Sequence, residues 1–171
     1  MESVATHPFW QNLFRQSHGK TDKIANFWQN TALFEGLSTK RCRSLIHEMH
    51  IRKYQPGETV FNKGEVGIGA ALIFSGKVQI RAGDILLAEL TQGDFFGEVA
   101  LVLDEPRTAD AIACEQTELV FFLRPGLNEL IDKAPRDGVK VVNNLCHILA
   151  TRLGKANEQL SHNKTSEVQD S

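Results

Sequence analysis

Short apolar runs separated by glycine turns occupy residues 50–123, and this pattern constrains the fold more than any other feature of the chain. Within these runs hydrophobic and polar residues alternate with a period of two, as they do in half-buried strands. The turns fall at residues 56–57, 64–67, 75–76, 83–84 and 93–94. Regular short strands with this punctuation predict an antiparallel sandwich or roll.

Helical periodicity flanks the strands on both sides. Residues 21–48 favour two helices, the first capped by Thr21 or Asp22 and the second by Ser38. A long helix is predicted after Pro135. One face of this helix is apolar and consists of Val142, Leu145, Leu149, Leu153, Ala156 and Leu160. Such a face fits either a dimer seam or packing onto the helix's own roll, and we expect a homodimer through it.

The pattern divides the chain into three parts. Residues 1–32 are predicted to form a helical extension, and residues 33–160 the domain itself. Residues 161–171 are polar and are predicted to be a disordered tail. The extension also carries an aromatic stripe, which we expect to pack against the domain or a partner: Phe9, Trp10, Leu13 and Phe14.

Composition narrows the class of protein. A chain of 171 residues is one domain of ordinary size, and its net charge of −2 argues against nucleic acid as a main partner. The three cysteines are isolated and odd in number, which favours free thiols in a reducing compartment: Cys42, Cys114 and Cys146. No stretch is long enough to span a bilayer. These features predict a cytoplasmic protein without membrane contact.

A second pattern, within residues 96–110, concerns function rather than fold. Gly97 predicts a short helical turn, because a residue without a Cβ lets consecutive backbone N–H groups face a single point. Arg107 supplies a full positive charge and a planar fork of donors that suits a phosphate. The carboxylate of Glu98 cannot bind a phosphate, but it can accept a hydrogen bond from a sugar hydroxyl. Together these residues predict a ligand that carries one phosphate and one sugar.

This segment resembles the phosphate-binding cassette of cyclic nucleotide-binding domains, which occur in catabolite-activator-type regulators, kinase regulatory subunits and cyclic-nucleotide-gated channels. The spacing from Gly97 to Arg107 and the run Pro-Arg-Thr-Ala at 106–109 carry the resemblance. It implies that Glu98 holds the ribose 2′-hydroxyl and that Arg107 pairs with the cyclic phosphate. The full set of implied ligand-binding residues is Phe96, Gly97, Glu98, Val99, Ala100, Arg107, Thr108, Ala109 and Asn157.

The resemblance covers residues 33–160 and implies a fold that is mainly β with flanking helices. The expected architecture is a double-stranded β-helix, or jelly-roll-like β-roll, with N-terminal helices and a long C-terminal helix. The implied ligand is cAMP or cGMP without a metal ion. Residues 64–71 depart from the family pattern, since they keep glycines and one acid but lose the second acid and the aromatic residue.

Two functions fit these observations. The first is a cyclic mononucleotide sensor that transmits binding through its C-terminal helix to its own dimer or to an unidentified effector protein. The second is a binding-silent β-roll that serves as an interaction or dimerisation scaffold. An intact pair of Glu98 and Arg107 favours the sensor. Thr108 discriminates poorly between the two nucleotides, and we expect cAMP.

Enzymatic function is not expected. The related cupin enzymes bind a metal through histidines inside the roll, whereas no histidine occurs between residues 51 and 146. No serine or cysteine has the local context of an activated nucleophile. The chain ends soon after the long helix, so we also expect no helix-turn-helix domain and no direct DNA binding.

Overall fold

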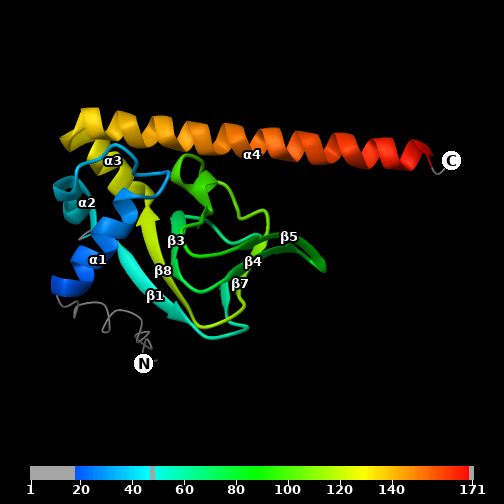
Figure 1. Ribbon diagram of the computed structural model, residues 1–171, viewed down its shortest axis with the longest axis horizontal. Coiled ribbons are helices and arrows are strands. Elements are labelled where there is room, and N and C mark those ends of the chain that lie inside the picture. The colour runs from blue at the N-terminus through cyan, green and yellow to red at the C-terminus, as the bar shows by residue number, and fades with distance from the viewer. Residues whose placement is uncertain (1–17, 47–48, 170–171) are drawn as a thin grey trace, which may run out of the picture.

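Two antiparallel sheets of four strands each form a roll, and helices cover one end of it (Figure 1). This computed structural model describes the backbone of residues 18–46 and 49–169, and the side chains of 23–46 and 49–158. The strands are β1 (His50–Tyr54), β2 (Thr59–Phe61), β3 (Gly69–Ser75), β4 (Val78–Ala82), β5 (Ile85–Leu90), β6 (Phe95–Phe96), β7 (Asp110–Ala113) and β8 (Thr117–Leu123). Their order is β1-β8-β3-β6 in one sheet and β2-β7-β4-β5 in the other. The predicted β-roll is confirmed.

Strand β8 lies between two hydrophobic cores. Alternate side chains of a strand point to opposite faces of its sheet. Leu119 and Phe121 pack in the core between the two sheets, whereas Val120 and Phe122 pack in the core beneath the helices. This arrangement explains why residues 119–123 form an unbroken apolar run, because both faces of the strand are covered.

The helices are α1 (His18–Gln29), α2 (Thr39–Ile46), α3 (Arg124–Lys133) and α4 (Pro135–Gln169). Ser38 caps α2 as predicted, since its Oγ accepts a hydrogen bond from the backbone N–H of Arg41 at 3.2 Å. The predicted start of α1 at Thr21 or Asp22 is wrong, because the helix already begins at His18. A capping residue is a local signal, and packing of the helix can extend its first turn upstream.

Helix α1 packs into the same core as the rest of the domain. Trp28 is fully buried, stacks on Phe34 with ring centroids 4.4 Å apart and meets Phe122 edge to face. The described part of the predicted extension, residues 18–32, therefore shares its core with β8 of the roll. The aromatic stripe predicted at residues 9–14 lies outside the described residues.

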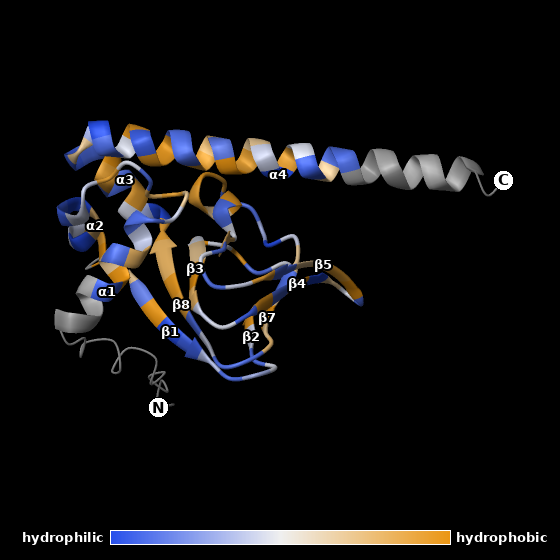
Figure 2. Cartoon of the chain, viewed as in Figure 1, coloured by the Kyte–Doolittle hydropathy of each residue, from blue (hydrophilic) through white to orange (hydrophobic). Residues whose placement is uncertain are grey.

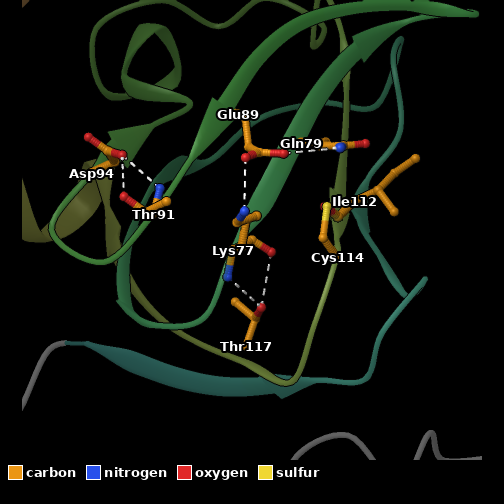
Figure 3. A network of polar contacts seen from close by, with 8 residues as sticks. All are labelled: Lys77, Gln79, Glu89, Thr91, Asp94, Ile112, Cys114 and Thr117. Atoms are coloured by element: carbon orange, nitrogen blue, oxygen red, sulfur yellow. Dashed lines mark hydrogen bonds and ion pairs between the residues drawn. The ribbon is translucent and has the colours of Figure 1, made fainter.

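A network of polar contacts holds several turns of the roll (Figure 3). The Thr117 hydroxyl accepts a hydrogen bond from the backbone N–H of Lys77 at 3.2 Å, which ties the start of β4 to β8. Lys77 Nζ lies 2.9 Å from Glu89 Oε1 and links β4 to β5. Just before β6, the Asp94 carboxylate accepts a hydrogen bond from the backbone N–H of Thr91 at 2.7 Å. This turn sets the direction in which the chain enters the predicted cassette.

Helix α4 is anchored along its N-terminal half and extends beyond the roll (Figure 1). Asp137 accepts a hydrogen bond from Arg41 Nε at 2.8 Å, and the Asn144 amide donates to the backbone carbonyl of Leu33 at 3.0 Å. Both contacts join α4 to the segment around α2. The helix has 35 residues, so its length is about 52 Å.

The predicted apolar face of α4 divides into two parts. Leu145 is buried, and Val142 and Leu149 are half-buried against the helical core. Hydrophobic residues accordingly lie on the side of α4 that faces the roll (Figure 2). Farther along, Leu153 is 63% exposed and Ala156 is also exposed. Packing onto the roll therefore accounts for the first part of this face and not for the second.

The predicted disordered tail requires a correction. Helix α4 continues through Gln169, so residues 161–169 are helical. This segment contains neither glycine nor proline. Once the packed part of a helix exists, each further residue adds a hydrogen bond at little cost, and a polar sequence can continue it.

Candidate functional site

The predicted cassette, residues 96–109, begins with a tight turn at Gly97. This residue has φ 73° and ψ 19°, a left-handed conformation that favours glycine. It is followed by a short 3-10 helix, η2 (Glu98–Leu101). The predicted glycine turn is therefore present. The backbone N–H of Ala100 donates to the Gly97 carbonyl at 3.2 Å, which closes this turn on itself.

Arg107 is fixed in orientation by backbone carbonyls from two other segments. Its Nη1 donates to the Gly97 carbonyl at 3.0 Å, and its Nη2 donates to the Gly69 carbonyl at 2.8 Å. Burial lowers the pKa of Arg107, while the charges of Glu65 and Glu98 act in the opposite direction. A guanidinium remains protonated in proteins, so the site holds a partly desolvated positive charge.

Glu98 is a buried carboxylate with an unexpected partner. It is 6% exposed, and its Oε1 lies 2.6 Å from Nη1 of Arg152 on α4. The guanidinium of Arg152 also donates to the backbone carbonyl of Phe95. The long helix is therefore joined to the cassette by a charged pair. Sequence reasoning missed Arg152, because no local pattern indicates which turn of α4 passes over the cassette.

The remaining predicted residues of the cassette differ in their exposure. Phe96, Ala100 and Ala109 are buried, so their side chains belong to the interior on which the cassette rests. Val99 and Thr108 are exposed, so their side chains can meet a ligand or a partner. The structure thus brings the cassette residues together in one loop and turn, around Arg107 and Glu98.

Asn157 occupies a different place from the rest of the predicted site. It is exposed on α4, five residues after Arg152. At about 100° per residue, it lies about 140° around the helix from Arg152, whereas Ala156 shares the Arg152 face. In a straight helix, Asn157 therefore does not face the cassette of its own chain. Its role as a ligand contact stays a prediction.

Two further residues support the cassette. Arg124, at the start of α3, donates through Nε to the Ala100 carbonyl at 2.9 Å and through Nη2 to the Leu103 carbonyl at 2.7 Å. It thereby joins α3 to the loop. A Cβ at Gly67 would lie 2.7 Å from that of Ala100 and 2.9 Å from Cζ of Arg107, so only glycine fits there. The glycine-rich pattern of residues 64–71 could have indicated Gly67 from the sequence. No local sequence pattern indicated the role of Arg124.

The geometry suits the binding of an anion and a hydroxyl group side by side. A fixed guanidinium next to a buried carboxylate can hold a phosphate and a hydroxyl of one ligand. Among the side chains that the structure describes, residues 23–46 and 49–158, no three His, Cys, Asp or Glu gather as metal ligands would. None of the described helices is both long and apolar enough to cross a membrane.

Comparison with known proteins agrees with this geometry. Residues 51–134, which contain the whole cassette, match the family described as "Cyclic nucleotide-binding domain". This segment belongs to that family. In this chain, helices α1, α2 and α4 lie outside the matched segment and share its hydrophobic core.

Individual relatives bind different nucleotides according to their names. The chain is 32% identical over 137 residues to the Cyclic AMP receptor protein of Thermus thermophilus, covering 77% of this chain and 62% of that protein. It is 38% identical over 81 residues to a cGMP-dependent protein kinase of Plasmodium berghei, covering 47% and 10%. The crystal structure of the Thermus thermophilus Catabolite Activator Protein superposes with a TM-score of 0.68 at 33% identity, covering 77% and 62%. The chain thus spans less than two thirds of these relatives.

Proposed function

We propose that the chain is a cyclic mononucleotide sensor whose cassette holds the ligand. The observation that carries the proposal is the orientation of Arg107 by the carbonyls of Gly97 and Gly69. A guanidinium has five N–H donors, so two bonds to carbonyls leave others for a phosphate. A preoriented donor loses little conformational freedom on binding.

The second contact of the proposal is between the sugar and Glu98. The ribose 2′-hydroxyl would donate to this carboxylate, which at present is paired with Arg152. Because a carboxylate can accept several hydrogen bonds, the ligand need not displace Arg152, but it changes the geometry of the pair. The cassette and α4 are therefore coupled through Glu98.

Signal transmission would follow from this coupling. A ligand shifts a conformational equilibrium only when it binds the two states with different affinity. Contact with the Glu98–Arg152 pair supplies such a difference, because the pair exists only when this turn of α4 lies on the cassette. Nucleotide binding would then reorganise α4 after Leu149, in its own dimer or against an effector protein.

The partner that we propose is a second copy through α4. The exposed residues Leu153 and Ala156 continue an apolar face that is buried only up to Leu149. Asn157 fits the same proposal, since it points away from its own cassette and toward the region that a second helix would occupy. There it would touch the base, either after a bend in α4 or from the second copy.

One observation favours the alternative of a binding-silent scaffold. Arg152 of the same chain pairs with Glu98, so this carboxylate has a partner within the protein itself. A domain that only holds a partner needs no more than this internal contact. It does not need Arg107, however, whose partly buried charge is costly unless an anion binds there.

Isothermal titration with cAMP and cGMP tests the proposal. We expect one site per chain, and tighter binding of cAMP than of cGMP because the more extensive of the two matches described above is to a cyclic AMP receptor. Adenosine serves as the control that lacks the phosphate and should bind much more weakly. Tenfold tighter binding of cGMP would refute the expected preference for cAMP. If neither nucleotide gives a heat of binding, the sensor proposal is refuted in favour of the binding-silent scaffold.

The wider role follows from the same proposal. We place the chain in the cytoplasm, since its three cysteines are free thiols, as expected in a reducing compartment. It acts as a regulatory module without catalysis of its own. The effector that receives the signal is to be sought among proteins that bind α4.

A further inference from the structure

The environment of Arg107 contains an aromatic ring that the cassette pattern does not include. Cζ of Arg107 lies 4.2 Å from the centroid of the Phe61 ring, well within the range of a cation–π contact. A Cβ at Gly67 would be 2.9 Å from Cζ, and one at Gly97 would be 2.6 Å from Nη1. We call Phe61, Gly67 and Gly97 together the arginine cradle.

The arginine cradle lies against the Arg107 guanidinium, whose flat faces hydrogen bonds cannot stabilise. The carbonyls of Gly69 and Gly97 accept from the edge of the guanidinium, but its flat faces have no hydrogen-bonding capacity. Burial lowers the pKa of Arg107, so the surroundings oppose its charge. Among the described residues, no carboxylate oxygen lies within 4.0 Å of it. An aromatic face is the group that can stabilise a cation from above its plane.

Phe61 is itself held in place from both sheets. It ends β2, where it pairs with Ala111 of β7. Its ring lies 5.9 Å from that of Phe96, which belongs to β6 of the other sheet and directly precedes Gly97. The ring is therefore fixed between the two sheets and, through Phe96, next to the turn of the cassette. A side chain held in this way can determine the plane of the guanidinium beside it.

We infer that Phe61 is the positioning residue of the phosphate site. Its ring sets the plane of the Arg107 guanidinium, so that the N–H groups not used by Gly69 and Gly97 are directed at an incoming anion. The inference rests on the proposed function for the identity of that anion, the phosphate of a cyclic nucleotide. The position of Arg107 in the free protein does not depend on it.

The first test uses the free protein and needs no nucleotide. The Arg107 side-chain Nε–H resonance in NMR should be shifted by the ring current of Phe61. Phe61→Leu should remove that shift, and Phe61→Tyr, which keeps a ring, should retain it. Phe74→Leu is the matched control, since Phe74 is also half-buried and contacts another ring, that of Phe27. An Arg107 resonance unchanged in Phe61→Leu would overturn the inference.

The second test measures nucleotide affinity in a double-mutant cycle. Phe61→Leu should weaken cAMP binding about fivefold in the parent, and Phe61→Tyr should restore it. In the Arg107→Lys background the guanidinium plane is absent, and Phe61→Leu should have little further effect. An equal loss in both backgrounds would mean that Phe61 acts only through packing and would refute the inference.

The two tests separate this inference from the proposed function. If the parent binds neither cAMP nor cGMP, the proposed function fails, and the Arg107 resonance still decides whether Phe61 positions the guanidinium. If the parent binds cAMP but the cycle shows no coupling, the positioning role fails and the proposed function stands.

Discussion

Arg107 and Glu98 differ in the kind of group that holds each of them. Arg107 is oriented by two backbone carbonyls, which cannot move away without disturbing β3 and the cassette turn. Glu98 is oriented by Arg152, a long side chain on another element that is itself 41% exposed. The proposed phosphate contact is therefore rigid, whereas the proposed sugar contact is adjustable. Under the proposed function, the first would provide affinity and the second would respond to the ligand.

Replacing Arg107 tests the rigid contact. Arg107→Ala removes a charge-assisted hydrogen bond to the phosphate, which typically contributes about 1.5–3 kcal/mol. We expect titration to show cAMP affinity reduced about tenfold or more, with circular dichroism unchanged. Arg136→Ala, which removes an exposed arginine at the start of α4, is the control. Parent-like affinity in Arg107→Ala would refute the assignment of the site.

Tyr54 offers a test of pH dependence in the roll. Burial raises its pKa to about 12, and among the described residues its hydroxyl has no hydrogen-bond partner. The folded state thus holds this proton more tightly than the unfolded state, whose tyrosine titrates near 10. Its contribution to stability is complete below pH about 10 and is lost as pH rises toward 12, by about 2 kcal/mol.

Tyr54→Phe should remove this loss, and at neutral pH it should leave stability unchanged or slightly higher. Denaturant unfolding at several pH values measures both effects. The chain contains one tyrosine, so the ultraviolet absorbance of tyrosinate reports Tyr54 alone. A titration midpoint near 10 in the folded parent would contradict this account of its burial.

At the scale of elements, α4 consists of two parts with different contacts. Its N-terminal part is a structural helix, fixed by Asp137 and Asn144 to the segment around α2. One turn after Leu149, Arg152 reaches the cassette, and Leu153 beside it faces solvent. The change from the packed part of α4 to the part that we propose transmits the signal thus occurs within a few residues of one continuous helix.

Hydrogen exchange across residues 145–160 tests this division. We expect exchange to slow when cAMP is added, because the ligand orders the Glu98–Arg152 contact. In Arg152→Ala, exchange of this segment in the free protein should be faster and the effect of cAMP smaller. Arg136→Ala again serves as the control. If the parent helix exchanges identically with and without nucleotide, the proposed transmission through α4 is refuted.

For the whole molecule, the unburied hydrophobic surface indicates where a partner would bind. Leu153 on α4 and three consecutive residues of the edge strand β5, namely Ile85, Leu86 and Leu87, are exposed. Exposed apolar residues that lie together can mark an interaction site, and we expect the partner to bind at α4. The exposed part of α4 has the length and periodicity that a second helix can pair with.

Light scattering should therefore show a dimer. Leu153→Lys places a charge in the proposed dimer interface on α4. This variant should be a folded monomer. Val139→Lys is the matched control, because Val139 is also exposed on α4, at 57%, but lies in the anchored part. A parent that is monomeric at all accessible concentrations would refute the dimer, and an equal effect of both substitutions would place the seam elsewhere.

The sequence by itself determined the features that depend on neighbours along the chain. Alternation and glycine turns predicted the roll, Ser38 predicted the start of α2, and the spacing from Gly97 to Arg107 predicted the cassette. Each of these signals arises within a few residues, because turns, caps and strand faces are local properties.

Only the tertiary structure decided which distant side chains complete the site. Arg152 meets Glu98, and Phe61 meets Arg107, across elements far apart in the chain. The start of α1 and the continuation of α4 through Gln169 likewise differ from the local pattern. The physical reason is the same for all of them. Such contacts depend on the angles at which packed elements cross, and hydrophobic periodicity specifies which face of an element is buried but not what it meets.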